Sequence, residues 1–334
     1  MHLQHENLVR MRQRAAVVRA IRDYFDAQGF TEVDTPVALT AVAPEPHLEA
    51  PSVSLHLGHT TSHRFLQTSP ELPMKRLVGS GLAPIYQIAP CFRDGDYSPQ
   101  HRPEFRLLEW YRAPAHWTEL LHDCEQLLLS AAAAVGAGEA IDYQNRSIRL
   151  TPPYPRISVE EAFLTHAGFS IRARETPQAL APQVRRLGLP TQPDDSWDDL
   201  FYRVFLSVVE PALVADGQPF FLTHYPAPLA ALAQLDPSDP RVSERFELYV
   251  AGMELANGFG ELTDANRQRQ RFARDKALRQ ARGMAAYPED EAFYAALEQM
   301  PPAAGSALGL ERLLMLVLDV NEIDAVNFLP WSET

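Results

Sequence analysis

The sequence predicts an α+β fold in which helices flank an antiparallel β-sheet. Segments 8–28 and 117–135 carry apolar residues at helical spacing. Segments 91–93 and 104–112 have the composition of short strands, and the polar loop between them would join an antiparallel pair. Strands and helices do not alternate regularly, and the chain has neither a glycine-rich phosphate loop ending in Lys and Ser or Thr nor a dinucleotide fingerprint. Any nucleotide would therefore bind on the sheet, held by arginines.

Composition narrows the class of protein. The chain has 334 residues, 46% hydrophobic and 22% charged, as is ordinary for a globular protein. We interpret residues 1–334 as one catalytic domain with a helical insertion at about 137–214, a region where prolines gather and periodicity weakens. The net charge of -13 disfavours nucleic acid, and hence tRNA, as a partner. We find no membrane-spanning run, no signal peptide and no metal spacing at Cys91 and Cys124, and we expect a cytoplasmic protein.

In the first half of the chain, the sequence predicts a helix followed by an edge strand. The helix 8–28 has Val17, Ile21 and Phe25 on one side and ends at Gly29. Pro36 closes the following segment, 30–37, as an edge strand. The further elements that we predict here are strands at 64–68 and 85–88, a helix at 74–79, the strand pair 91–93 and 104–112, and the helix 117–135.

The second half begins with a capping box. Ser158 and Glu161 have the spacing that starts a helix, and Gly168 would close it. The remaining predicted elements are a helix at 195–213, strands at 219–225 and 246–250, a tight turn at 251–252, a strand at 253–263, a solvated charge-rich helix at 263–282 and an apolar helix at 308–320.

The strand 253–263, MELANGFGELT, places two carboxylates in an apolar, glycine-rich run. Glycines thin a strand where a ligand comes close, and acidic groups among apolar neighbours are costly unless a cation pairs with them. That cation could be a metal, a substrate ammonium or an arginine elsewhere in the chain. Glu254 and Glu261 have opposite parity on an ideal strand, so they can face one ligand only if segment 258–260 bulges.

Two arginines are candidates for phosphate contacts. Arg93 ends a short apolar strand, and a guanidinium there can grip a phosphate through a planar fork of donors. Arg312 interrupts an apolar helix directly after the glycine-containing segment 307–309. The alternatives are a surface salt bridge for Arg93 and a side chain that extends to solvent for Arg312.

Carboxylates and a tyrosine form a second group. Glu109 and Tyr111 lie on one face of strand 104–112 by period-two alternation, together with Phe105 and Leu107. With Glu71 and Glu261 they could hold a buried ammonium, which needs carboxylate partners and a hydroxyl to orient it. Each of these residues alone would more often be an exposed or helix-capping residue.

The three groups together suggest a reaction. Arginines for phosphates, carboxylates for a metal and further carboxylates for an ammonium are suited to activating a carboxylic acid with ATP as an acyl-adenylate. The substrate carboxylate itself attacks the α-phosphate, so this step needs no general base. Catalysis then consists of in-line positioning and of neutralising phosphate charge with Mg²⁺ and arginines.

Six segments, in order, resemble the core of the class II aminoacyl-tRNA synthetases in its lysine-specific branch. The resemblance covers nearly the whole chain. Its segments are GFTEVDTPVA (29–38) as the first motif, TSPEL (68–72), CFRDGDYSPQHRPEFRLLEWYRA (91–113) as the second motif, RFELYVAG (245–252), MELANGFGELTD (253–264) and GLERLLM (309–315) as the third motif.

The helix of the first motif begins by Leu8, so we expect no N-terminal OB-fold anticodon-binding domain. A core of this length is similar to the family of elongation factor P (R)-β-lysine ligases, and the ELANGF sequence and Ala307 favour the same family. The resemblance implies ATP and Mg²⁺, lysine or (R)-β-lysine, elongation factor P as acceptor, and a homodimer. The alternatives are an enzyme that activates α-lysine for tRNA or another amine, an asparagine-forming relative, and an inactive synthetase-like regulatory module.

The resemblance also assigns residues. It implies Arg93 and Arg312 as the catalytic arginines, Glu254 and Glu261 as the metal ligands, and Ser69, Glu71, Tyr111 and Glu261 around the lysine-like substrate. Around ATP it implies Arg93, Gly95, Arg102, Glu254, Leu255, Gly309 and Arg312. The second motif usually reads Arg-x-Glu, whereas this chain has Arg93-Asp94-Gly95. Asp94 or Asp96 must replace the missing glutamate, or that nucleotide contact is absent.

Overall fold

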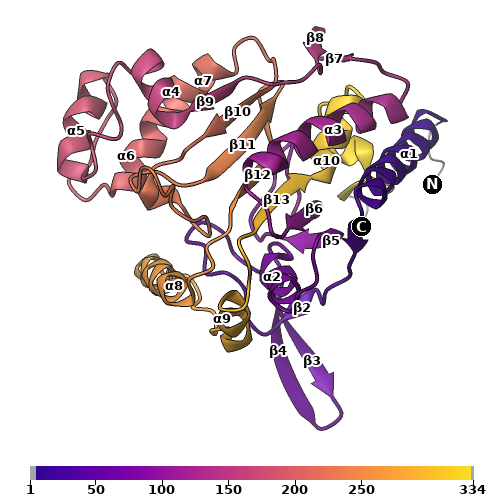
Figure 1. Cartoon of the computed structure of the whole chain (residues 1–334), viewed down its shortest axis with the longest axis horizontal. Helices are drawn as coiled ribbons and strands as arrows, with labels where there is room; N and C mark the ends of the chain where they lie inside the picture. Colours follow the sequence, from indigo (N-terminus) through magenta and orange to yellow (C-terminus); the bar gives the residue numbers. More distant parts are fainter. Residues whose placement is uncertain (1–4, 332–334) are drawn as a thin grey trace.

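The computed structural model describes residues 5–331, which are organised around one eight-stranded sheet (Figure 1). The strand order is β1-β5-β6-β13-β12-β11-β10-β9. The edge pairs β1–β5 and β9–β10 are parallel, and every pair between them is antiparallel. The strands are β1 Thr31–Glu32, β5 Ile85–Phe92, β6 Glu104–Arg112, β9 Arg156–Ser158, β10 Phe220–Thr223, β11 Arg245–Val250, β12 Met253–Gly260 and β13 Ala304–Gly309. The predicted antiparallel sheet with flanking helices is confirmed.

One face of the sheet is covered by three helices that close the main core. They are α1 (His5–Ala27), α3 (Thr118–Ala134) and α10 (Leu310–Val317), which gather on the same side in Figure 1. The apolar side of α1 that the sequence predicted, with Val17, Ile21 and Phe25, is fully buried there. The opposite face of the sheet is therefore the one that remains available for a ligand.

The remaining helices lie around the open face and in the segment before β10. They are α2 Glu71–Gly79, α4 Val159–His166, α5 Pro177–Arg186, α6 Trp197–Val204, α7 Glu210–Leu213, α8 Ala265–Ala281 and α9 Glu291–Leu297. A π-helical turn, Phe205–Val209, connects α6 to α7, so the single helix expected at 195–213 is divided. The predicted capping box of Ser158 and Glu161 starts α4.

Two of the strand predictions need correction. The segments 85–88 and 91–93 belong to one strand, β5, which runs through Pro90. The helix expected at 308–320 begins only at Leu310, because Ala304–Gly309 forms the central strand β13 between β6 and β12. The small residues of β13 have no apolar periodicity, so the sequence contained no pattern that would reveal a strand.

The segment 137–214 contains strands as well as helices. A small hairpin of β7 (Ala140–Tyr143) and β8 (Arg146–Arg149) precedes β9, which pairs with β10 and extends the main sheet. Helices α4 to α7 pack on a second apolar core that includes side chains of β10 and β11. The expectation of a purely helical insertion was therefore incomplete.

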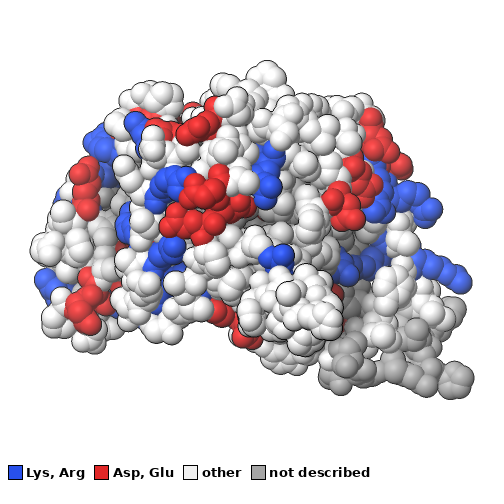
Figure 2. All heavy atoms as spheres, turned by 90° about the horizontal axis from the view of Figure 1, so that it is seen from below, with Lys and Arg blue, Asp and Glu red and all other residues white. Residues whose placement is uncertain are grey.

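A three-stranded sheet projects from the body at the lower end of Figure 1. It consists of β2 (Ala38–Leu39), β3 (Ser52–Leu57) and β4 (Thr60–Leu66). On the face shown in Figure 2, acidic and basic side chains are interspersed. Within residues 5–331, no helix has the length and apolarity needed to cross a membrane.

Helix α8 is less solvated than its composition indicates. Arg279 is 0% exposed, and Phe272 and Gln268 are also buried. The Arg279 guanidinium packs on the Tyr287 ring and holds the loop that follows β2. The expectation of a purely solvated helix was wrong because this arginine acts as an internal anchor.

Candidate active site

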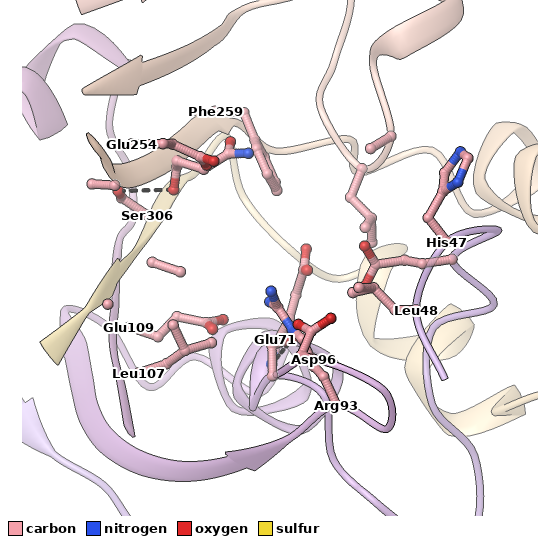
Figure 3. A pocket seen from close by; sticks show the side chains of 18 of the residues that line it. His47, Leu48, Glu71, Arg93, Asp96, Leu107, Glu109, Glu254, Phe259 and Ser306 are labelled. Atoms are coloured by element: carbon pink, nitrogen blue, oxygen red, sulfur yellow. Dashed lines mark hydrogen bonds between the residues drawn. The ribbon is translucent and has the colours of Figure 1, made fainter. Parts of the chain in front are cut away.

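A cavity of about 460 Å³ lies on the open face of the sheet. Its floor is formed by β6, β12 and β13, and its walls come from α2, α10 and the loop 40–50. Figure 3 shows the side chains of Glu109, Glu254 and Arg93 directed into one central space. Segments far apart in the sequence therefore meet here.

Strand β6 supplies one side of the floor. Phe105, Leu107, Glu109 and Tyr111 all line the cavity, which confirms the predicted alternation. Tyr111 donates a hydrogen bond from its hydroxyl to Glu109 Oε1 at 2.6 Å. Glu109 Oε2 is buried and has no hydrogen-bond partner among the residues that the structure describes. An oxygen of this kind needs a cation or donor that a ligand would supply.

Strand β12 contains a bulge that brings Glu254 to the cavity face. Tyr249 of β11 pairs with Glu254 while Leu248 pairs with Ala256, so Leu255 is the extra residue. The bulge was predicted at 258–260 and lies instead at Leu255. It restores the parity of Glu254 with Asn257 and Phe259, and these three half-exposed side chains line the cavity.

A buried lysine joins two of the predicted carboxylates. Lys75 Nζ lies 2.5 Å from Glu71 Oε1 and 2.6 Å from Glu261 Oε2, and the Lys75 side chain is 1% exposed. Glu261 is buried and does not line the cavity itself, and its Oε1 has no hydrogen-bond partner within the described part of the chain. With Glu109, three carboxylates share one lysine. This end of the cavity therefore has a surplus of negative charge that suits ammonium groups.

The protonation states follow from that surplus. Burial would lower the pKa of Lys75, but Glu261 and Glu71 outweigh it and hold the pKa above its usual value, so Lys75 keeps its charge. Burial, only partly opposed by Lys75, raises the pKa of Glu261 to about 8. Burial and then the Glu71 carboxylate raise the pKa of Glu109 well above its usual range. The empty pocket therefore binds protons that a cationic substrate would displace.

Gly305 of β13 makes room for this cluster. A Cβ atom at this position would lie 2.3 Å from Tyr111 Cε1 and 2.5 Å from Glu261 Oε1. Any larger residue must push one of these two side chains out of place. The glycine is therefore required by the packing of the substrate pocket.

The opposite end of the cavity carries the two predicted arginines. The Arg93 guanidinium stacks on Phe105 at 5.0 Å, its Nε is buried without a partner, and it forms no ion pair within residues 5–331. Arg312 Nη1 donates to the Glu254 backbone oxygen at 2.7 Å, and Nη2 lies 2.5 Å from His101 Nε2. Neither guanidinium group is paired with a carboxylate of residues 5–331, and both are suited to phosphate.

His101 accepts the hydrogen bond from Arg312. Burial lowers the pKa of His101 and the Arg312 charge lowers it further, so the ring is neutral. Its Nδ1 lies 2.7 Å from Ser98 Oγ. The contact fixes the direction of the Arg312 guanidinium.

Two residues of the second-motif loop, Gly95 and Arg102, were predicted to bind ATP, and only Arg102 lines the cavity. Arg102 lines the cavity, but its Nε donates to Asp324 Oδ1 at 2.9 Å and its Nη2 to Asp324 Oδ2 at 2.7 Å. Gly95 has a φ of 84° and does not line the cavity, whereas Asp96 does. Of the two aspartates weighed as replacements for the missing glutamate, Asp96 is the one that faces the site. The roles of Gly95 and Arg102 towards ATP stay predictions.

The remaining predicted residues lie where the sequence placed them. Ser69 and Glu71 line the wall at the start of α2, while Leu255 and Gly309 line the floor near Arg312. The same cavity thus contains residues assigned to both ends of the expected reaction.

The donor set at Glu254 fits a hard divalent cation. Burial and then the neighbouring Glu247 raise the pKa of Glu254 to about 7, and a bound cation would favour its ionised form. Mg²⁺ at nucleotide sites takes one or two carboxylates and completes its shell with phosphates and water. Glu261, the other predicted ligand, is instead engaged with Lys75. No cluster of three or more His, Cys, Asp or Glu in residues 5–331 could hold a metal by itself. Metal binding by Glu254 and Glu261 stays a prediction, and Glu254 is the better candidate of the two.

Sequence reasoning missed Lys75 and Gly305. Lys75 follows Glu71 by four residues, a spacing that pairs opposite charges on a helix and could have revealed it. Gly305 had no signal, because its importance depends on side chains of β6 and β12 that only the fold brings near. Glu45 and His47 of the loop 40–50 were also missed as lining residues.

Comparison with known proteins identifies the class first. The family model for class II tRNA synthetases of the D, K and N type matches residues 2–333. The chain therefore belongs to this family, and its antiparallel sheet with a site on the open face is that family's catalytic core.

Individual relatives within this family indicate the kind of enzyme. The relatives that match over nearly the whole chain are named as ligases, so the chain is an enzyme of the ligase class. An elongation factor P–(R)-beta-lysine ligase of Haemophilus influenzae is 37% identical over 320 residues, covering 95% of this chain and 93% of the relative. The protein of the same name from Pectobacterium atrosepticum is 38% identical over 318 residues, covering 94% and 92%. A lysine–tRNA ligase of Pelotomaculum thermopropionicum is 36% identical over 320 residues, covering 95% of this chain but only 62% of the relative.

Proposed function

We propose that this protein activates (R)-β-lysine with ATP as an acyl-adenylate and transfers the acyl group to a lysine ε-amine of elongation factor P. The observation that carries the proposal is the cluster of Glu71 and the buried Glu109 and Glu261 beside the buried Lys75. Its surplus negative charge is matched by a substrate with two ammonium groups. The near full-length match to proteins named for this reaction supports the same substrate.

The first half-reaction uses the two ends of the cavity. The substrate ammonium groups would pair with Glu109 and Glu71, with the Tyr111 hydroxyl orienting them. Its carboxylate would then lie towards Arg93 and Arg312 and attack the α-phosphate of ATP. The guanidinium groups stabilise the charge that develops on the phosphate, which is an electrostatic contribution of about 3 kcal/mol for one well-placed donor.

Magnesium would supply charge neutralisation at the phosphates of ATP. Glu254 would hold it, because its carboxylate lies beside Glu247 and its backbone oxygen accepts from Arg312. The Arg312 contact with that backbone oxygen keeps the end of the bulged strand close to the phosphate site.

Ala307 is the residue that favours β-lysine over α-lysine. It lies on β13 opposite Glu109 and lines the cavity. Its methyl group occupies space between the carboxylate cluster and the arginines, where the position of an amino group along the substrate is decided. We expect Ala307→Gly to shift the preference towards α-lysine by about tenfold, since one methyl group in a pocket is worth about 1–3 kcal/mol.

The acceptor is proposed to be a protein rather than a nucleic acid. The formal charge is -13, and the face in Figure 2 has interspersed charges without a broad basic area. Cys91 and Cys124 are buried free thiols, in keeping with a reaction in the cytoplasm.

Intact-mass spectrometry of elongation factor P tests the proposal. Incubation with the enzyme, ATP, Mg²⁺ and (R)-β-lysine should add one lysyl mass to elongation factor P, and replacement of its acceptor lysine by arginine should prevent the addition. Label that moves from α-lysine to tRNA, with elongation factor P unmodified, would instead support the second candidate, a lysyl-adenylate enzyme that serves tRNA. This second candidate is supported by the match to a lysine–tRNA ligase, which covers 62% of that relative's length.

A further inference from the structure

The loop 40–50 presents a carboxylate that the proposed adenylation step does not use. Glu45 is half-buried and lines the cavity. Figure 3 shows the neighbouring loop residues His47 and Leu48 on the far side of the cavity from Glu109. Glu45 therefore belongs to the wall that faces the floor of the substrate site.

A buried arginine fixes the backbone of Glu45. Arg279 Nη1 donates to the Glu45 carbonyl oxygen at 2.8 Å, and Nη2 lies 2.6 Å from Glu49 Oε2. Arg279 Nε donates to the Ala285 oxygen at 2.9 Å, and the Tyr287 hydroxyl accepts from the Ala50 backbone N–H at 2.9 Å. A guanidinium with an exposed fraction of 0% is costly unless its donors are used, and here they hold this loop in one position.

Four charged side chains act on the Glu45 carboxyl. Arg93, which follows β5, is the strongest of them, followed by Glu71 of α2, Arg245 of β11 and Asp275 of α8. Arg93 belongs to the phosphate end of the cavity and Glu71 to the ammonium end. Glu45 lines the same cavity as both residues, so an adenylate that spans the two ends would pass its acyl carbon in front of this wall.

We propose that Glu45 is the group that takes the proton from the acceptor ammonium in the transfer step. This inference rests on the function proposed above. A lysine side chain arrives as R–NH₃⁺ and must lose a proton before its nitrogen can attack. Glu45 accepts that proton, the C–N bond to the acyl carbon forms, and the C–O bond to AMP breaks. The second proton leaves the nitrogen for the released AMP or water, so an amide, AMP and two protons are produced.

The environment of Glu45 supports this role. Burial raises its pKa above the usual value for a glutamate, with Arg93 opposing the shift and Glu71 adding to it. A carboxylate with a raised pKa is a better base, so its transfer rate should increase with pH as Glu45 loses its proton. Neither the acyl-adenylate chemistry nor the two arginines require such a group.

The two half-reactions can be measured separately in Glu45→Gln. ATP–pyrophosphate exchange reports adenylate formation, and single-turnover transfer of labelled β-lysine to elongation factor P reports the second step. We expect transfer to fall about 10²-fold more than exchange, because a general base contributes at least that factor. Glu45→Asp, which keeps a carboxylate on a shorter stem, should recover part of the lost transfer.

Hydroxylamine separates proton transfer from a merely structural effect. It is neutral near pH 7 and attacks an acyl-adenylate without first losing a proton. Glu45→Gln should therefore keep hydroxamate formation while losing transfer to elongation factor P. Equal loss with both nucleophiles, or equal loss of exchange and transfer, would overturn the inference.

Asp198 provides a matched control. It lines the same cavity, but the charged groups that act on it are Arg274, Asp199, His47 and Arg282 rather than Arg93 or Glu71. Asp198→Asn makes the same charge change at the rim and should leave the ratio of transfer to exchange near that of the wild type. A loss of transfer as large as that of Glu45→Gln would show that any carboxylate lining the cavity has this effect, and it would overturn the inference. A wild-type protein without any exchange would overturn the proposed function itself.

Discussion

At the scale of single residues, Gly305 leaves no room for a Cβ atom in the proposed amino-acid pocket. A methyl group there would lie 2.3 Å from Tyr111 Cε1, so Gly305→Ala must displace Tyr111 or Glu261. Overpacking of this kind costs about 1–3 kcal/mol, and we expect it to increase the KM for the amino acid by at least about fivefold. The KM for ATP should change less. Gly138→Ala, where no atom lies within 4 Å of the new Cβ, is the control. Equal effects on both substrates would mean that Gly305 does not shape the amino-acid pocket.

The carboxylate surplus predicts a pH dependence of substrate binding. The pKa of Glu109 in the empty pocket is raised by burial and by Glu71, so the folded protein holds a proton there that a free carboxyl would have lost. An ammonium pairs with the ionised form only. Affinity should therefore rise as the pH increases above the normal carboxyl range of about 4 to 5, and binding should release protons.

Calorimetry in buffers of different ionisation enthalpy measures that release. The wild type should release protons when lysine or β-lysine binds near pH 6, and Glu109→Gln should release fewer. Proton uptake, or a release that is the same in both proteins, would contradict the assignment of the raised pKa to Glu109.

At the scale of elements, one buried aspartate ties α1 and α3 to β6. Asp123 of α3 accepts hydrogen bonds from Tyr24 at 2.6 Å, Trp110 Nε1 at 3.0 Å and Arg112 Nη2 at 2.7 Å. Asp123→Ala leaves the Arg112 guanidinium without its partner. We expect a loss of about 3–5 kcal/mol in the free energy of unfolding, measured by urea denaturation.

The surface ion pair of Arg22 and Glu32 is the control for that experiment. Its side chains are 46% and 40% exposed, so Glu32→Ala should cost below about 1 kcal/mol. A cost for Asp123→Ala as small as that of the control would show that the tie contributes little to the fold.

The sequence predicted elements with strong periodicity and missed those without it. Helix α1 and strand β6 were placed within a few residues, because their apolar faces repeat at 3.6 and 2 residues. Strand β13 consists mainly of small residues and was not predicted, and its last two residues were included in the predicted helix 308–320. The need for a bulge in β12 followed from the parity of Glu254 and Glu261, but its position at Leu255 depends on the pairing with β11.

The candidate site was predictable where side chains have a fixed chemical use. Arg93, Arg312, Glu109 and Tyr111 all meet in the cavity that the structure contains. Lys75 escaped notice because a lysine in an amphipathic helix is usually solvated, and only the tertiary fold buries it. Arg102 is a residue whose type fits a phosphate but whose guanidinium is paired with Asp324.

At the scale of the whole molecule, the family resemblance predicts a homodimer through α1 and β1. Leu8 and Val9 of α1 are 43% and 41% exposed. Exposed apolar side chains on this helix are suited to a partner surface. Sedimentation at micromolar concentration should give a species of twice the 37.4 kDa chain mass. A species of one chain mass at that concentration would contradict the dimer.

The central claim is that one cavity binds ATP at its arginines and a diamino acid at its carboxylates. ATP–pyrophosphate exchange with Mg²⁺ and either (R)-β-lysine or α-lysine tests this most directly, since exchange needs both ends to work together. The account predicts exchange that depends on the amino acid, is faster with (R)-β-lysine, and is lost in Arg312→Ala. Absence of exchange with either amino acid, or full exchange in Arg312→Ala, would contradict it.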